Sequence, residues 1–233
     1  MNVNENQEEN GACDPETSNL QTNNRKPKLI YYYDALCGWC YGFGSVMKEV
    51  EKHFGDQVEL EVVSGGLFRG ERVGPINEVA PYIKDGAYKT VEEKTGVKFG
   101  AQFLEDIQGE GRIVLDSLPP AMALCIVKDQ SPEHQLQFAE RLLHSVYFEG
   151  SNPVNLNLLG LYATEIGFDS MNFAMLLQTP KYQAAAEQEF AKFAQSQLQG
   201  MPALILEKEG EQILLSNGYT DFQVLQGRLE QVL

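Results

Sequence analysis

The chain has 233 residues, of which 43% are apolar and 22% are charged, and its formal net charge is −15. These proportions are ordinary for a globular protein with a substantial buried core. The acidic balance argues against a nucleic acid or an anionic membrane as the partner, because either would require a basic surface. We find no run of about eighteen consecutive apolar residues, so a membrane-spanning helix is not expected.

Residues 1–27 are polar, carry several acidic side chains and contain no aromatic residue. This composition predicts a disordered amino-terminal tail. A secretory signal would begin with basic residues and continue with an apolar run, and that pattern is not visible. The expected location of the protein is therefore cytoplasmic.

The next segment predicts a strand, a helix and a second strand. An apolar, aromatic run at residues 29–33 is typical of a strand covered on both faces. Apolar residues then recur at helical spacing from Phe43 to Phe54. Residues 58–62 alternate between apolar and acidic, which indicates a half-exposed strand near a sheet edge. Together these elements form a βαβ unit, normally with parallel strands.

Between residues 67 and 178, strand patterns disappear and helical patterns replace them. Helices are predicted at residues 119–129, 131–150 and 155–167, with weaker patterns between 77 and 108. In the carboxyl-terminal part, Thr179 offers a capping hydroxyl and Pro180 follows at the first helical position, which predicts the start of a helix. Two apolar runs then flank a glycine at position 210 and predict a hairpin. Thr220 and Gln223 have the spacing of a capping box for a last helix.

This order of elements predicts an α/β protein. The order βαβ, helical block, αββα matches a thioredoxin-like fold with a helical domain inserted after the first βαβ unit. In this division the thioredoxin-like domain comprises residues 28–66 and 179–233, the inserted helical domain residues 67–178, and the disordered tail residues 1–27.

The strongest chemical signal is the pair Cys37 and Cys40, placed where the first predicted strand gives way to the first helix. A helix amino terminus offers free backbone N–H groups and the positive end of the macrodipole, which together stabilise an anion. The thiolate is the form of cysteine that attacks a disulfide. We predict that Cys37 is the nucleophile and that Cys40, more buried on the same helix, is the resolving thiol.

A zinc site is the alternative interpretation of this pair. Structural zinc takes four ligands, commonly from two closely spaced pairs. The other candidates, Cys13, Cys125 and three histidines, are isolated from one another in the sequence. We therefore favour redox chemistry and predict no metal. Cys125 lies in an apolar helical pattern and is interpreted as a buried, inert thiol.

Met201 and Pro202 form the second feature of the predicted site. Pro202 follows a predicted helix end and opens an apolar strand. In thioredoxin-like folds a cis-proline at this point faces the C-x-x-C pair and leaves the preceding backbone free to pair with an extended substrate. We predict that Pro202 takes this position and that the Met201–Pro202 peptide bond is cis. A trans proline at the first position of the strand is the alternative.

Residues 34–42, Asp-Ala-Leu-Cys-Gly-Trp-Cys-Tyr-Gly, resemble the FrnE-like and predicted protein-disulfide-isomerase branch of the DsbA family. That branch has the pattern D-x-x-C-x-W-C-Y-x-G, which is one residue longer at its end. Residues 200–203 resemble its cis-proline turn, and residues 147–150 and 167–169 resemble its helical insert. The resemblance covers about residues 28–232.

The resemblance implies thiol–disulfide exchange on protein or peptide substrates through Cys37 and Cys40. It implies no cofactor beyond the redox-active disulfide and an external thiol reductant or oxidant, with glutathione or a thioredoxin system as partners. A glutathione-dependent transferase or isomerase of the same fold is an alternative, although such enzymes have serine in place of the first cysteine. A peptide- or metal-binding module without redox turnover is another.

Two departures from the DsbA pattern bear on the chemistry. DsbA itself has a histidine between its cysteines, whereas Gly38 and Trp39 supply no charge here, which argues against a strong oxidant. Thioredoxin and DsbA also carry a buried acid six residues before the first cysteine, and Tyr31 occupies that position. Asp34 is the nearest acid, and both a catalytic and a helix-capping role are open to it. The direction of exchange stays open.

Overall fold

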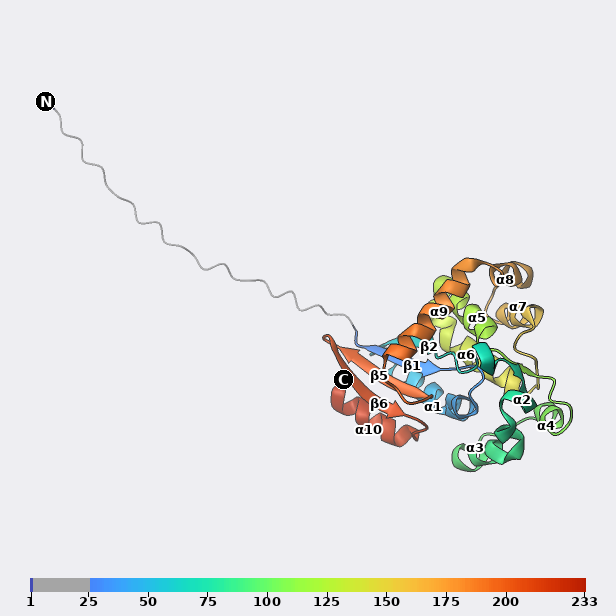
Figure 1. Ribbon diagram of the computed structural model, residues 1–233. Coiled ribbons are helices and arrows are strands. Elements are labelled where there is room, and N and C mark those ends of the chain that lie inside the picture. Colours follow the sequence, from blue (N-terminus) through green and yellow to red (C-terminus); the bar gives the residue numbers. More distant parts are fainter. Residues whose placement is uncertain (2–25) are drawn as a thin grey trace.

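The computed structural model describes residue 1 and residues 26–233 (Figure 1). Most of the predicted tail, including Cys13, therefore lies outside the described residues. The strands are β1 (Lys28–Tyr33), β2 (Glu59–Ser64), β3 (Gly74–Pro75), β4 (Val114–Leu115), β5 (Ala203–Lys208) and β6 (Glu211–Asn217). The α-helices are α1 (Gly38–Phe54), α2 (Ile76–Val79), α3 (Tyr88–Thr95), α4 (Ala101–Gln108), α5 (Leu118–Gln130), α6 (Gln135–Tyr147), α7 (Leu156–Thr164), α8 (Ser170–Leu176), α9 (Pro180–Gln195) and α10 (Phe222–Val232).

A four-stranded sheet with the order β2-β1-β5-β6 forms the centre of the fold. β1 and β2 are parallel, so β1-α1-β2 is the predicted βαβ unit. β5 pairs antiparallel with β1 and β6 antiparallel with β5, which forms the predicted hairpin. This arrangement confirms the α/β thioredoxin-like fold class. The carboxyl ends of β1 and β2 lie at the same end of the sheet. The chain leaves β1 there and continues into the segment that carries Cys37 and Cys40, which we call the dithiol segment.

Alternation along β1 divides the buried side chains between the two faces of the sheet. Leu29, Tyr31 and Tyr33 belong to the larger core, which also contains the apolar face of α1. Ile30 and Tyr32 belong to a smaller core on the opposite face, against which Phe193 of α9 packs. Figure 1 shows α9 crossing the sheet on one side and α1 and α10 on the other. β1 is thus covered on both faces, as its apolar sequence predicts.

The edge strand β2 is closed by side chains rather than by another strand. Gln135 of α6 accepts from Val62 N at 2.8 Å and donates to Leu60 O at 2.9 Å. The carboxylate of Glu189 in α9 accepts from Ser64 N at 2.8 Å. An edge strand with open backbone groups is a template for pairing with other chains. Helices from the middle and end of the sequence therefore protect the strand that leads to the site.

The segment between β2 and α9 is mainly helical, with one difference from the prediction. β3 and β4 pair antiparallel over two residues each, where the sequence shows no strand pattern. Such a short ladder is too brief to leave an alternating pattern. A π-helical turn, Ile83–Ala87, precedes α3, and Gly86 within it has a φ of 120°. This turn carries side chains to the dithiol.

The prediction that the hydroxyls of Thr179 and Thr220 cap helices is wrong. Thr179 precedes Pro180 at the start of α9 as predicted, but its hydroxyl donates to Leu176 O at 2.7 Å instead of capping the helix. Asp221, not Thr220, is the N-cap of α10, and the Thr220 hydroxyl lies 3.2 Å from that of Ser216. Hydroxyl groups bond readily to nearby backbone and side chains, so spacing alone does not determine their partners.

Candidate active site

Cys37 and Cys40 lie at the beginning of α1, directly after β1. Cys37 is the N-cap residue, with an extended backbone, and its Sγ accepts a hydrogen bond from Cys40 N at 3.3 Å. Unpaired N–H groups at a helix start are normally satisfied by a side-chain oxygen, and here the sulfur takes that place. Both cysteines are free thiols.

The two thiols have different surroundings. Cys37 is 5% exposed, whereas Cys40 is 0% exposed. Burial, followed by the hydrogen bond and charge of Cys37, raises the pKa of Cys40 well above its ordinary value. Cys37 is thus the more accessible sulfur, and the thiol of Cys40 keeps its proton unless a base removes it.

The segment before β5 faces the first thiol. The Met201–Pro202 peptide bond is cis, and Cys37 Sγ lies 3.6 Å from Met201 O. Pro202 O accepts from Gly218 N at 2.8 Å, which joins the segment to the end of β6. A Cβ on Gly65 would lie 2.2 Å from Met201 Sδ. Glycine at position 65 therefore makes room for the Met201 side chain.

Trp39 lies between two hollows at the surface. Its relative exposure is 36%. On one side a hollow extends over Met201 and includes one charged residue, Lys94. On the other side is a cavity of about 110 Å³ between the dithiol and the helices that follow β2. The residues around this cavity are Leu36, Cys37, Gly38, Trp39, Leu67, Tyr82, Ile83, Ala87, Tyr88, Val91, Phe99 and Tyr147.

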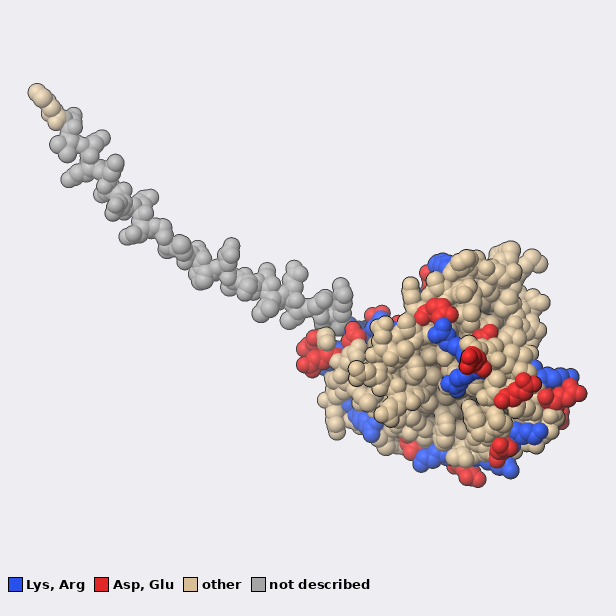
Figure 2. Space-filling view, in the orientation of Figure 1, with Lys and Arg blue, Asp and Glu red and all other residues tan. Residues whose placement is uncertain are grey.

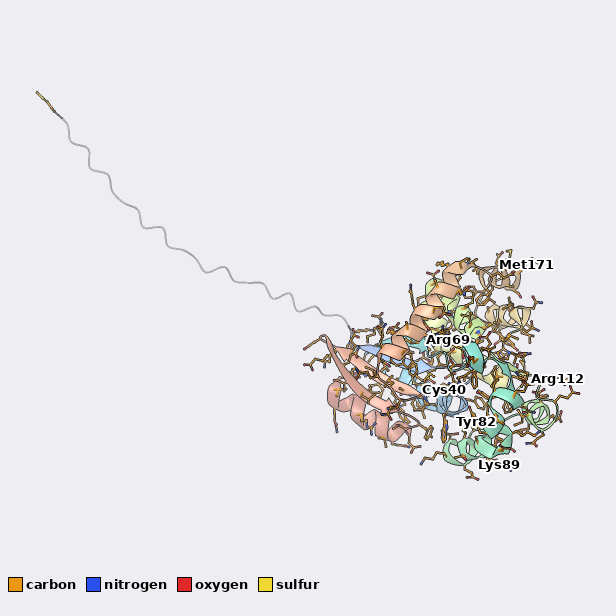
Figure 3. All side chains as sticks on the ribbon, viewed as in Figure 1. Cys40, Arg69, Tyr82, Lys89, Arg112 and Met171 are labelled. Carbon is orange, nitrogen blue, oxygen red and sulfur yellow. The ribbon has the colours of Figure 1, made fainter. Side chains whose placement is uncertain are left out.

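This cavity contains no charged side chain among its lining residues. Much of its wall comes from the π-helical turn, from α3 and from Tyr82, which directly precedes the turn. Figure 3 labels Tyr82 close to Cys40. No pattern in the sequence indicates Tyr82, Tyr88 or Phe99 as residues of the site. The resemblance of residues 147–150 to the family insert was the one signal that pointed to this region, because it includes Tyr147.

Asp34 does not cap α1 with its side chain. Its Oδ1 accepts from Leu36 N at 2.9 Å and Ser117 Oγ at 3.1 Å, and its Oδ2 accepts from Leu67 N at 2.8 Å. Burial raises the pKa of Asp34, and these hydrogen bonds oppose the rise. The carboxylate thus fastens the dithiol segment to the residues that follow β2 and precede α5, and of the two roles open to Asp34 its side chain does not take that of the helix cap, which belongs to Cys37.

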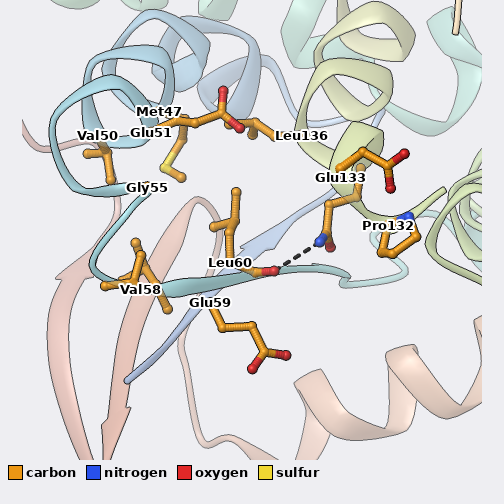
Figure 4. Close-up of a pocket in the computed structure, with 12 residues that line it drawn as sticks. Met47, Val50, Glu51, Gly55, Val58, Glu59, Leu60, Pro132, Glu133 and Leu136 are labelled. Atoms are coloured by element: carbon orange, nitrogen blue, oxygen red, sulfur yellow. Dashed lines mark hydrogen bonds between the residues drawn. The ribbon is translucent and has the colours of Figure 1, made fainter. Parts of the chain in front are cut away.

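A larger hollow, of about 370 Å³, lies at the opposite end of α1 (Figure 4). It is formed by the end of α1, the start of β2 and the start of α6, and the hydrogen bond from Gln135 to Leu60 O joins two of its lining residues. The lining includes no cysteine. Size alone therefore does not identify the site, and the smaller cavity beside Cys37 is the one that meets the reactive sulfur.

In Figure 2, acidic and basic side chains are interspersed around a broad uncharged area. Within residues 26–233, no group of three or more His, Cys, Asp and Glu side chains is arranged to hold a metal ion. Over the same range, no helix is long and apolar enough to cross a membrane. Cys125 is 6% exposed, and burial raises its pKa.

The thioredoxin-like sheet, the C-x-x-C pair at a helix start and the opposing proline define a chain of the thiol–disulfide oxidoreductase class. Residues 28–230 match the family described as the DSBA-like thioredoxin domain, and the protein belongs to this family.

Solved structures agree on the fold. A putative protein disulfide isomerase from Nitrosomonas europaea superposes with a TM-score of 0.78 and 22% identity, over 89% of this chain and 97% of that one. The cytosolic disulfide reductase DsbM from Pseudomonas aeruginosa superposes with a TM-score of 0.70 and 21% identity, over 88% of this chain and 97% of that one. DsbM has also been solved with GSH, and that structure gives a TM-score of 0.69.

A curated relative is the ClpXP adapter protein SpxH from Halalkalibacterium halodurans, 25% identical over 175 residues. The match covers 71% of this chain and 55% of SpxH, so the chain spans about half the length of that relative.

Proposed function

We propose that the protein catalyses thiol–disulfide exchange on protein or peptide disulfides, with Cys37 as the nucleophile and Cys40 as the resolving thiol. The observation that carries the proposal is the unequal placement of the two sulfurs on one helix start. The sulfur of Cys37 accepts a backbone N–H there and the residue is 5% exposed, while Cys40 is fully enclosed. A thiolate at a helix amino terminus is stabilised by those N–H groups and by the macrodipole.

The proposed reaction has two steps. The Cys37 thiolate attacks one sulfur of the substrate disulfide, which forms a mixed disulfide and releases the other substrate sulfur as a thiolate. The Cys40 thiolate then attacks Cys37 Sγ, which forms the Cys37–Cys40 disulfide and releases the second substrate thiolate. Two electrons pass from the protein dithiol to the substrate. The reverse sequence oxidises a substrate dithiol.

The neighbouring residues have supporting roles in this proposal. Met201 presents its backbone to an extended substrate, next to Cys37 Sγ. Pro202 leaves no N–H at this position that would compete for Cys37. Gly38 and Trp39 shape the surface around the sulfur. Asp34 holds the dithiol segment in place through its three hydrogen bonds.

The cavity beside Cys37 favours a protein or peptide substrate. Its lining is apolar and aromatic and includes no charged side chain. A bulky apolar side chain next to the substrate cysteine would lose water on entering it, which is favourable by about 25 cal/mol per Å² of apolar surface. Glutathione carries charged carboxylates, which are costly to place in such a cavity.

The proposal includes a cytoplasmic location and an external thiol partner, glutathione or a thioredoxin system, that resets the dithiol. A reducing compartment suits a catalytic rather than a structural C-x-x-C pair. The DsbM structure supports this part, since that protein is called a cytosolic disulfide reductase.

Insulin reduction in the presence of dithiothreitol tests the proposal. Wild type should accelerate precipitation of the insulin chains, and Cys37→Ala should reduce the rate to that of dithiothreitol alone. Cys125→Ala is the matched control, because it removes a buried thiol outside the pair and should retain the wild-type rate. A Cys37→Ala variant as active as wild type would disprove the assignment.

A glutathione-linked reaction is the second candidate. It is favoured by the DsbM structure solved with GSH and by Lys94 in the hollow beyond Trp39, where a carboxylate would find a positive charge. Steady-state rates with oxidised glutathione and with a cystine peptide would separate the two. A preference for glutathione that falls in Lys94→Gln would favour this candidate over protein substrates.

A further inference from the structure

The turn that follows β2 forms a support for the side chain of Met201. A Cβ on Gly65 would lie 2.2 Å from Met201 Sδ and 3.4 Å from the ring of Phe193. A Cβ on Gly66, where φ is 69°, would lie 2.8 Å from the ring of Phe190. Both rings belong to α9. Met201 therefore rests directly on the backbone of this turn, and α9 packs against the same two glycines.

Two carboxylates fasten the two ends of this turn. At its far end, Leu67 N donates to Asp34 Oδ2 at 2.8 Å. At its near end, Ser64 is the last residue of β2, and its N–H donates to Glu189 Oε2 at 2.8 Å. Hydrogen bonds to a carboxylate are shorter and stronger than those between neutral groups. The turn is thus tied at one end to the dithiol segment and at the other end to α9.

The carboxylate of Glu189 is itself held in place by an ion pair. Its Oε1 accepts from Lys128 Nζ of α5, and the same ammonium group donates to Val62 O of β2 at 2.6 Å. The side chains of Lys128 and Glu189 are 19% and 12% exposed, so this pair is largely enclosed. Enclosed pairs are screened by salt less than exposed ones. One oxygen of Glu189 is therefore fixed on α5, and the other is directed at the end of β2.

We propose that Glu189 is a positioning residue for the exchange reaction. Its carboxylate fixes Ser64, and the turn that follows then fixes Met201. The carbonyl oxygen of Met201 lies 3.6 Å from Cys37 Sγ, so this chain of contacts sets where an extended substrate meets the sulfur. The inference rests on the proposed function, because it concerns the backbone that the substrate would pair with. Glu189 itself touches neither the substrate nor the reacting atoms.

Small displacements are sufficient for such a role to matter. A misplacement of about 1 Å, caused by a mutation far from the reacting atoms, can slow an enzyme by about a hundredfold. A substrate without a peptide backbone does not use Met201 for alignment. The effect of Glu189 should therefore depend on whether the substrate is a peptide.

An ion pair that only stabilises the edge of β2 is the alternative, and two conservative substitutions separate it from the proposal. Glu189→Asp keeps the charge that faces Lys128, but it is one methylene shorter and loses its reach to Ser64 N. Glu189→Gln keeps the length and an acceptor oxygen, but it removes the charge. The proposal expects the aspartate variant to be the more damaging to peptide turnover, whereas a role for the ion pair alone expects the reverse.

Single-turnover oxidation of the reduced full-length protein measures the effect. Trp39 is the sole tryptophan and lies between the two cysteines in sequence, so its fluorescence follows the dithiol. Two disulfides are compared in excess over protein: a cystine peptide, whose backbone can pair with Met201, and hydroxyethyl disulfide, which has no peptide backbone. The second-order rate constant is measured for both substrates, and the half-saturating concentration and limiting rate for the peptide.

Glu189→Asp should lower the second-order rate constant for the peptide by about tenfold, mainly through a higher half-saturating concentration. Its rate constant for hydroxyethyl disulfide should stay within about twofold of wild type, because that substrate does not need the aligned backbone. Glu189→Gln should stay within about threefold of wild type for both substrates, since it retains an acceptor for Ser64 N.

Lys192→Met is the matched control on the same helix. Lys192 pairs with Glu61 at 2.8 Å, within β2 rather than at its end. The substitution removes an ion pair beside the strand without removing the acceptor of Ser64 N. Both rate constants should therefore equal those of wild type.

Three results would overturn the proposal: equal losses for the two substrates in Glu189→Asp, an unchanged peptide rate in that variant, or a larger peptide loss in Glu189→Gln than in Glu189→Asp. Urea denaturation of each variant shows whether it is folded under the assay conditions, and Glu189→Gln decides between the two roles should the shorter side chain prevent folding. Failure of the proposed function would be distinct, because wild type would then be inactive toward both disulfides and in the insulin assay.

Discussion

Burial of single polar groups has measurable consequences, and Glu140 is the clearest case at the scale of the residue. The pKa of Glu140 is raised from an ordinary 4.5 to about 7. The folded protein therefore holds a proton that the unfolded chain has released between about pH 5 and pH 7. Stability falls as pH rises through this window, because the unfolded state then binds fewer protons than the folded state.

For wild type we expect the free energy of unfolding to fall by at most about 3 kcal/mol from this group as pH rises from 5 to 8. Glu140→Gln should lack that part of the pH dependence and be more stable than wild type at pH 8. Urea denaturation at both pH values measures this difference, with Glu49→Gln, whose side chain is 44% exposed, as the control. Equal pH dependence in wild type and Glu140→Gln would contradict the raised pKa.

Gly65 offers a second prediction at this scale. A Cβ at position 65 would lie 2.2 Å from Met201 Sδ, so Gly65→Ala must displace a flexible side chain beside the reactive sulfur. We expect a loss of several-fold in the insulin assay with a fall in stability of about 1–3 kcal/mol from overpacking. Gly227→Ala in α10, with open space around it, should retain activity. Unchanged activity in Gly65→Ala would show that the Met201 position is unimportant.

At the scale of the element, β2 depends on the helix side chains that close its edge. Gln135 satisfies Val62 N and Leu60 O together. Gln135→Leu should leave both backbone groups without that partner and lower the free energy of unfolding by about 2–4 kcal/mol, since each unsatisfied buried group costs about 1–3 kcal/mol. Gln137→Leu, at an exposed position of the same helix, should be nearly neutral. Equal effects in a denaturation series would disprove the closing role.

Elements with strong local patterns could be predicted from the sequence, and those defined by distant partners could not. The apolar spacing of residues 43–54 predicts α1, and the alternation of residues 58–62 predicts the edge strand β2. The ladder of β3 and β4 has no local pattern, because two residues per strand contain too little alternation. The hydroxyl of Thr220 bonds to Ser216, a partner that the capping-box spacing does not reveal.

At the scale of the whole molecule, the site joins parts of the chain that are far apart in sequence. The helix start, the C-x-x-C pair and Met201-Pro202 carry motifs, so sequence could indicate them. Tyr82 and Phe99 line the cavity beside Cys37 because helices of the middle segment pack over the dithiol. Glu189 likewise meets the end of β2 through helix packing. No spacing in the sequence relates these side chains to Cys37.

The cavity formed in this way should select substrates. Ala87→Phe would fill it, and we expect kcat/KM to fall several-fold for a cystine peptide with phenylalanine next to the half-cystine. The rate with hydroxyethyl disulfide, which has no side chain to place there, should stay within about twofold of wild type. Ala191→Phe at an exposed position of α9 is the control for added bulk. An equal loss for both substrates would argue against side-chain selection.

The division of labour between the two cysteines is the central claim, and trapping tests it most directly. Cys40→Ala should accumulate a mixed disulfide with a cystine peptide, because the first step is retained and the resolving thiol is lost. Peptide mapping by mass spectrometry should find the adduct on Cys37. An adduct on Cys125, or none on Cys37, would contradict the account.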